Sequence, residues 1–238
     1  MYHFSDEVDW SIFFRFDKRW IENMNWARIS PSAKAVLPVI ACHCNERGES
    51  FPGEETIAAL AGLTAKSVRK AIKVDLDGFP GFDWSYYLTK RGKRGKRFLL
   101  KFPPKREKGR AFFFFRGIMD GGIWRELKPS AQALYPVMRY FARYDDGEDE
   151  TLDDLDTFDE RYEKRKWESC SAKIKELEKY SGINRRSIHE ALRSLEKNFL
   201  IETDADGAGE KTWKVYIEPK KYWKASFLNQ SLKNQAVS

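Results

Sequence analysis

Basic side chains gather in one short, glycine-containing segment of the sequence. Six of the eight residues from Lys90 to Arg97 are lysine or arginine, and the other two are glycine. Cations at this density can neutralise phosphates and release their counterions, and glycine lets a turn follow a nucleic-acid backbone. The segment predicts phosphate contact, and the competing interpretation is a solvated basic loop that binds nothing. The candidate residues are Lys90, Arg91, Lys93, Arg94, Lys96 and Arg97.

Two further segments of similar sequence carry polar and basic residues at helical spacing. They begin at Gly62 and Gly182, and each follows a short helix-forming run. A tight glycine turn between two helices is typical of a helix-turn-helix, whose second helix fits the major groove. An amphipathic surface helix without a ligand would show the same spacing. The outward candidates are Thr64, Lys66, Ser67, Arg69, Lys70 and Lys73 in the first segment, and Arg185, Arg186, Ser187, His189 and Arg193 in the second.

Both segments belong to a longer internal repeat. The 14 residues from Trp26 to Val39 return 98 residues later as Trp124 to Val137, with seven identities. Self-similarity of this kind indicates a duplicated module, and the greater distance of 120 residues between Gly62 and Gly182 indicates an insertion of about 22 residues in the second copy. In each copy we expect an aromatic strand, a helix interrupted by a proline, the helix-turn-helix and a β-hairpin with a glycine-rich turn. The internal prolines, Pro38 and Pro136, are expected to kink their helices.

This order of elements predicts an α+β fold, mainly α, made of two tandem winged helices. The first would occupy residues 1–106 and the second residues 107–238, each with the size of an ordinary domain and its own core. The repeated tryptophans are predicted core residues. The aromatic runs Ile12–Phe16 and Phe112–Phe115 are expected either to close those cores or to form an interface.

The two copies differ in charge. Basic residues exceed acidic ones by eight in residues 1–110, whereas residues 111–238 carry one excess acidic charge. An insertion at about residues 145–168 is strongly acidic, and the second hairpin turn contains Asp204, Asp206 and Glu210. An acidic block is typical of a solvated loop, and an acidic hairpin repels phosphate. The second copy is therefore expected either to bind DNA mainly through its helix or to serve as a dimerisation domain.

The residues that catalysis or cofactor binding would need do not occur at suitable spacing. Cys42, His43 and Cys44 are consecutive in a predicted helix and point in different directions, so they cannot chelate one zinc ion. The sequence has no phosphate-binding loop of the Gly-x-x-x-x-Gly-Lys-Ser/Thr type. It also has no apolar run of the ~20 residues that a membrane-spanning helix needs. We therefore expect a cytoplasmic protein that is not an enzyme, with no cofactor, no metal and no membrane partner.

Three runs of the first copy resemble a known family. They are Ile29–Val39, Ser50–Ala58 and Gly62–Ile72, and residues 122–200 of the second copy match more loosely. Together they resemble the winged helix-turn-helix of plasmid replication initiators and phage replisome organisers. The resemblance implies binding of origin DNA, a monomer–dimer switch and recruitment of host replication proteins.

The sequence thus predicts a sequence-specific double-stranded DNA-binding protein, a replication initiator of a plasmid or other mobile element that binds origin repeats. Its expected partners are duplex DNA, a second copy of the chain as a homodimer, and host replication proteins. The first alternative is a transcriptional repressor with tandem winged helices. The second is an assembly protein that uses winged helices for protein–protein contacts.

Overall fold

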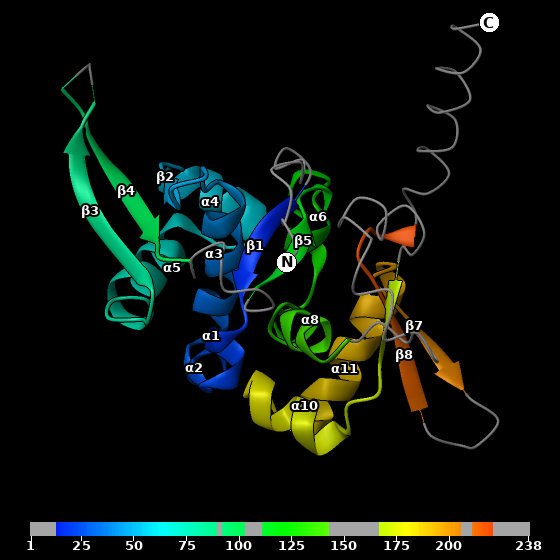
Figure 1. Cartoon of the computed structure of the whole chain (residues 1–238). Helices are drawn as coiled ribbons and strands as arrows, with labels where there is room; N and C mark the ends of the chain where they lie inside the picture. The colour runs from blue at the N-terminus through cyan, green and yellow to red at the C-terminus, as the bar shows by residue number, and fades with distance from the viewer. Residues whose placement is uncertain (1–12, 90–91, 103–110, 143–166, 206–210, 221–238) are drawn as a thin grey trace, which may run out of the picture.

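Helices and small antiparallel sheets make up the described part of the chain, in agreement with an α+β fold (Figure 1). The computed structural model describes residues 13–89, 92–102, 111–142, 167–205 and 211–220. The first half contains β1 (Phe13–Asp17), α1 (Arg19–Glu22), α2 (Asn25–Arg28), α3 (Pro31–Cys42), β2 (Glu49–Ser50), α4 (Glu54–Ala61), α5 (Ala65–Lys70), the π-helical turn η1 (Ala71–Asp75), β3 (Phe82–Leu88) and β4 (Arg94–Leu100).

The second half repeats this order with regular helices. It contains β5 (Ala111–Phe115), α6 (Gly117–Asp120), α7 (Ile123–Glu126), α8 (Pro129–Phe141), β6 (Trp167–Cys170), α10 (Ile174–Ser181), α11 (Arg185–Lys197), β7 (Ile201–Ala205) and β8 (Lys211–Tyr216). Each half has a three-stranded sheet, in the order β2-β4-β3 or β6-β8-β7. In Figure 1 the two hairpins, β3–β4 and β7–β8, extend to opposite sides of the molecule.

The helix starts follow from their capping residues. The Ser30 hydroxyl accepts a hydrogen bond from the Ala33 amide at 3.2 Å and caps α3, with Pro31 in the first turn. Thr64 and Asn184 cap the second helix of each helix pair in the same way. Lys128, which takes the place of Ser30 in the second copy, provides no such cap for α8. Helix α3 is therefore fixed at its start by its own sequence, whereas α8 depends more on packing.

The two halves meet through the aromatic strands, which pair with each other. Strand β1 runs antiparallel to β5, with Phe14 opposite Phe114 and Phe16 opposite Phe112. At the centre Arg15 lies opposite Phe113, which is its own counterpart 98 residues later. A register centred on a residue and its counterpart is the pattern of a two-fold interface, in which both partners use the same surface. The chain therefore contains a pseudo-dyad within one polypeptide.

The repeated tryptophans form reciprocal contacts across this pseudo-dyad. The Trp26 indole donates to the Ala133 carbonyl and the Trp124 indole donates to the Ala35 carbonyl, both at 2.9 Å. Each acceptor lies three residues before a helix-internal proline, in the turn where proline interrupts the hydrogen-bond ladder. The two bonds therefore join each short helix, α2 or α7, to the long helix of the other half.

The glycine turns of the two helix pairs also pack across the pseudo-dyad. Gly62 and Gly182 both have φ of +69°, which favours glycine. A Cβ on Gly62 would lie 2.6 Å from the Arg125 carbonyl oxygen, and one on Gly182 would lie 2.1 Å from that of Ala27. Arg125 and Ala27 are counterparts in the repeat. Each helix pair is thus held against a short helix of the other half.

The halves share one hydrophobic core, which differs from the expectation of two separate ones. A single cluster contains Trp26, Phe16 and Val68 of the first half together with Trp124 and Leu195 of the second. The reason is the strand pairing, because β1 and β5 each bury their aromatic side chains against both halves. The predicted boundary at residues 106 and 107 lies outside the described residues, and the two-domain division stays a prediction.

Lys34 is an unusual member of this interior and gives a first testable prediction. It is 2% exposed, and its ammonium donates to the Ala27 carbonyl at 3.2 Å. Burial lowers the pKa of Lys34 to about 8. The second half has Gln132 at this position, a neutral amide that donates to the Trp124 carbonyl at 2.8 Å. Lys34→Gln is therefore expected to raise the free energy of unfolding at pH 7 by about 1–2 kcal/mol.

The pH dependence gives this prediction its sign. Between pH 8 and 10.5 the unfolded chain holds the Lys34 proton and the folded chain does not, so the wild type gains stability as pH rises. The advantage of Lys34→Gln should shrink across that window. Urea unfolding at pH 7 and pH 10 measures it, with the exposed Lys101→Gln as control. An equal advantage at both pH values would contradict the assignment.

Candidate nucleic-acid interface

Helix α5 exposes its cations along one side and buries its apolar residues on the other. Val68 is buried, and so are Ala71 and Ile72 of the following turn. The predicted outward lysines are exposed, and among the described residues Lys66, Lys70 and Lys73 take part in no ion pair. Thr64 is exposed and Ser67 is half-buried at the start of the helix. The helix therefore offers unpaired positive charge together with two hydroxyls that can reach base edges.

A carboxylate connects this helix to the hairpin, which the sequence interpretation did not anticipate. Glu54 of α4 accepts hydrogen bonds from Arg69 of α5 at 2.8 and 3.0 Å and from Lys96 of β4. Burial opposes ionisation of Glu54, but the bonds from Arg69 and Lys96 leave its pKa below the ordinary value. Two of the predicted DNA-binding cations, Arg69 and Lys96, thus connect α5 to the β3–β4 hairpin through Glu54.

Glu54→Gln is expected to loosen this connection and to change DNA binding in a defined way. Removing one negative charge and releasing two cations should increase the salt dependence of duplex binding by about one to two phosphate contacts. Discrimination between a preferred and a scrambled duplex should fall, because the helix and hairpin are no longer held together. Fluorescence anisotropy over a salt series measures both quantities. Glu55→Gln, on the next residue of α4, is the matched control, and an unchanged salt slope and discrimination in Glu54→Gln would contradict the role of Glu54.

The hairpin presents the remaining basic residues. Lys93, Arg94 and Arg97 are exposed, whereas Lys90 and Arg91 lie outside the described residues. Arg97 forms an ion pair with Glu49 of β2. Hydrogen bonds from Asn45 and from Arg97 lower the pKa of the Glu49 carboxyl. The Arg94 guanidinium lies over the Tyr86 ring, 4.1 Å from its centroid. Of the cations described on this hairpin, Lys93 has no such partner among the described residues.

The second helix of the first helix pair, α5, changes pitch near its end. Helix α5 continues as the π-helical turn η1, which holds one residue more than the corresponding part of α11. The extra residue shows in the core positions: Ile72 corresponds to Leu192 at an offset of 120, but Leu76 corresponds to Leu195 at 119. The Ser30 hydroxyl donates to Asp75 of this turn at 2.7 Å. A π-helical turn is often found at functional sites, and here it sets where Lys73 points.

Helix α11 carries a second set of exposed cations with different surroundings. Arg185, Arg186, His189 and Arg193 are exposed, and Ser187 is half-buried. Ile174 stands where the first half has Glu54, and Glu190 stands where it has Lys70. In the second hairpin Lys214 lies 3.1 Å from Asp204, and Lys220, which follows β8, lies 2.8 Å from Glu202. Asp206 and Glu210 of its turn, and most of the acidic insertion, lie outside the described residues.

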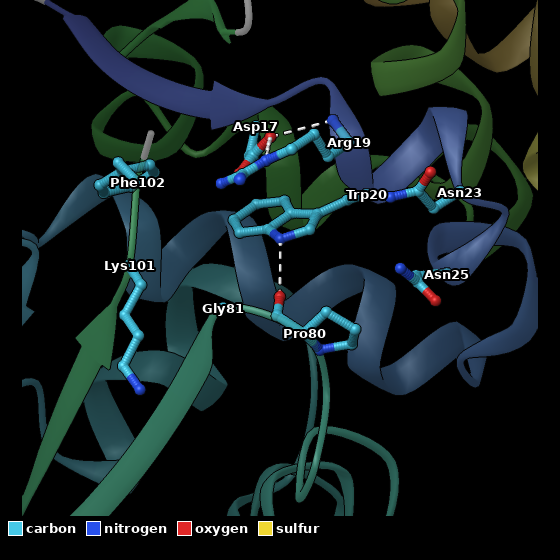
Figure 2. Close-up of a pocket in the computed structure, with 9 residues that line it drawn as sticks. All are labelled: Asp17, Arg19, Trp20, Asn23, Asn25, Pro80, Gly81, Lys101 and Phe102. Atoms are coloured by element: carbon cyan, nitrogen blue, oxygen red, sulfur yellow. Dashed lines mark hydrogen bonds and ion pairs between the residues drawn. The ribbon is translucent and has the colours of Figure 1, made fainter. Parts of the chain in front are cut away.

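A pocket of about 350 Å³, lined by charged, amide and aromatic residues, lies where the first hairpin joins the pseudo-dyad (Figure 2). Asp17, which is 1% exposed, accepts hydrogen bonds from the Arg19 side chain at 2.6 and 3.0 Å. The Trp20 indole donates to the Pro80 carbonyl at 3.0 Å, just before β3. Because the buried Asp17 carboxylate is already paired with Arg19, we assign the pocket a structural role in anchoring the hairpin to β1 and α1.

The described residues were also considered for reactive thiols, metal-binding groups and membrane-spanning helices. Burial raises the pKa of the Cys42 and Cys44 thiols to about 12 and that of Cys170 to about 11, and all three are free. Groups of side chains suited to hold a metal ion are not found there. None of the helices in the described part of the chain is long and apolar enough to cross a membrane.

Comparison with known proteins supports the helix-turn-helix. Residues 27–74 match the helix-turn-helix domain family, a stretch that runs from α2 to η1 and contains the predicted first helix pair. No curated protein and no solved structure matches the chain. The match, together with the exposed cations of α5, indicates a helix-turn-helix DNA-binding protein.

Proposed function

We propose that the chain is a sequence-specific double-stranded DNA-binding protein built from two winged helices, and that it initiates replication of a plasmid or other mobile element. The helix-turn-helix match over residues 27–74 supports DNA binding. The order of strand, helix, helix pair and hairpin in both halves supports the tandem winged-helix interpretation. The resemblance of residues 25–76 to replication initiators supports the role at an origin.

The pseudo-dyad is the observation that supports this proposal most, because it relates the two helix pairs that would read the DNA. The reciprocal packing of Gly62 and Gly182 relates the two helix pairs by the same pseudo-two-fold as the strands. A protein two-fold matches inverted half-sites in DNA. Because α5 and α11 differ in sequence, the two half-sites would differ as well. One chain would therefore read a composite site whose two parts run in opposite directions.

The two halves would contact the DNA in different ways. Helix α5 would lie in the major groove, and the β3–β4 hairpin would contact phosphates beside it. Helix α11 would read the second half-site with little help from its own hairpin, where Asp204 and Glu202 carry negative charge and pair with Lys214 and Lys220. Several such composite sites at an origin would bring several chains together. The protein would act in the cytoplasm without catalysis, together with host replication proteins.

A transcriptional repressor would use the same interface, and the pseudo-dyad fits an operator equally well. The two roles differ in what happens to the DNA after binding. Potassium permanganate modifies unpaired thymines in supercoiled DNA that carries the preferred site. An initiator is expected to produce reactive thymines next to the bound sites. Binding without any reactive thymine would favour the repressor.

A different variant distinguishes DNA binding from the second alternative, an assembly protein that binds other proteins through its winged helices. Replacing Arg91, Lys93, Arg94 and Lys96 together by alanine removes most of the hairpin charge. A DNA-binding protein should then lose duplex affinity and part of its salt dependence. Unchanged affinity and salt dependence would contradict a role of this hairpin in DNA binding.

A further inference from the structure

One face of the β3–β4 hairpin stays apolar beyond the point where the core ends. At the inner end of this face Phe82 and Phe98 are buried. Farther along β3, alternate residues lie on the same face, and Tyr86 is 43% exposed and Leu88 75% exposed. Trp84, which lies between Phe82 and Tyr86 on this face, is half-buried, so these side chains form a continuous strip that leads away from the core.

Cations alternate with the rings along this strip. Lys96 and Arg94 of β4 lie directly opposite Tyr86 and Leu88. The Arg94 guanidinium lies 4.1 Å from the Tyr86 ring centroid, and the Lys96 ammonium lies 5.3 Å from that of Trp84. The two rings contact each other edge to face at 5.3 Å. Rings, an aliphatic side chain and an exposed guanidinium thus share one surface.

The second half shows that the hairpin does not need these side chains to form. In the equivalent strand, Thr203 and Ala205 occupy the positions of Trp84 and Tyr86, and β7 still pairs with β8 in the same manner. Tyr87, on the opposite face of β3, has a different role. It lies across Gly95, where a Cβ would come within 2.7 Å of its ring, and it contacts the Phe51 ring at 5.4 Å. Tyr87 therefore supports the hairpin, whereas Tyr86 and Leu88 face solvent.

We propose that the face formed by Trp84, Tyr86, Leu88 and Arg94 binds single-stranded DNA by stacking on its bases. Proteins bind single strands with aromatic side chains on which bases stack and with cations that follow the backbone. An arginine lying on a ring extends such a platform, because its outer surface can take a further base. The occupant must be unpaired, since the flat faces of bases are covered inside a duplex. This site goes beyond duplex recognition and does not depend on which duplex sequence is read.

The test compares two oligomers of equal charge on the full chain. One is an oligo(dT) of about 15 nucleotides, and the other has the same backbone with abasic sites in place of the bases. The wild type is expected to bind the oligo(dT) more tightly by at least about tenfold, because only it can stack. Tyr86→Leu should abolish most of that preference. Tyr87→Phe, one residue away on the opposite face, keeps the ring that lies over Gly95 and contacts Phe51, and it should retain the preference.

A second variant covers the case in which Tyr86→Leu fails to fold. Leu88→Ser changes a side chain that is 75% exposed, so it should leave the fold intact and still weaken the preference for bases. Equal binding of both oligomers by the wild type would overturn the proposal. It would also be overturned if the preference survived in Tyr86→Leu and Leu88→Ser, or if these variants lost only duplex affinity, which would make the strip a wedge for the minor groove. A failure to select any preferred duplex would contradict the proposed function and leave this site untouched.

Discussion

Trp124→Ala is expected to destabilise the whole chain by about 3–5 kcal/mol, the usual cost of emptying a buried tryptophan site. Trp124 is fully buried, and its indole donates to the Ala35 carbonyl in the other half. The substitution leaves a cavity on the pseudo-dyad and an unpaired carbonyl on α3. Urea unfolding followed by far-ultraviolet circular dichroism measures the change.

The form of the transition matters as much as its midpoint. Because both halves contribute to one core, we expect a single cooperative transition for the wild type and for Trp124→Ala. Trp124→Phe serves as the milder comparison, because it keeps a six-membered aromatic ring in the core but loses the N–H donor and the volume of the five-membered ring. It should cost less than Trp124→Ala, because the cavity that it leaves is smaller. Two separate transitions, with only the second half affected by the substitution, would contradict the shared core.

Replacing Lys66 and Lys70 together by alanine is expected to lower affinity for the preferred duplex by about 100-fold at physiological salt. These lysines are exposed on α5 and form no ion pair among the described residues, so their charge is available to DNA. The salt dependence should fall by about two phosphate contacts. Anisotropy measurements with a labelled duplex give both numbers.

The control for this pair removes the same charge elsewhere. Lys18 and Lys101 lie outside the helix-turn-helix, and their replacement by alanine should change affinity by no more than a few-fold through the overall field. If both double variants weakened binding equally, the effect would be one of net charge. The assignment of α5 as the reading helix would then fail.

The local elements could be predicted from the sequence because their signals are local. A glycine turn between two helix-forming runs identified both helix pairs, and in the structure Thr64 and Asn184 cap the second helix of each pair. The hairpins followed from apolar runs on either side of a glycine-rich turn. The cations of α5 were placed on the outward face by helical spacing, and the described ones are exposed.

The contacts between the halves could not be predicted, because a repeat encodes similar folds without saying which surfaces meet. Trp26 and Trp124 were correctly predicted as core residues, but their acceptors are 107 and 89 residues away. The same holds for Glu54, whose bond to Lys96 spans 42 residues. The extra residue in η1 also has no signature of its own and becomes visible only when the buried positions of both helices are compared.

The most direct test of the account is selection of bound sequences from a random duplex pool, with native mass measurement of the resulting complex. The pseudo-dyad predicts one chain on one site, with two unlike half-sites in inverted orientation. It also predicts that changes in α5 alter one half-site and changes in α11 the other. A symmetric palindrome occupied by two chains, or two half-sites in the same orientation bound by one chain, would contradict it.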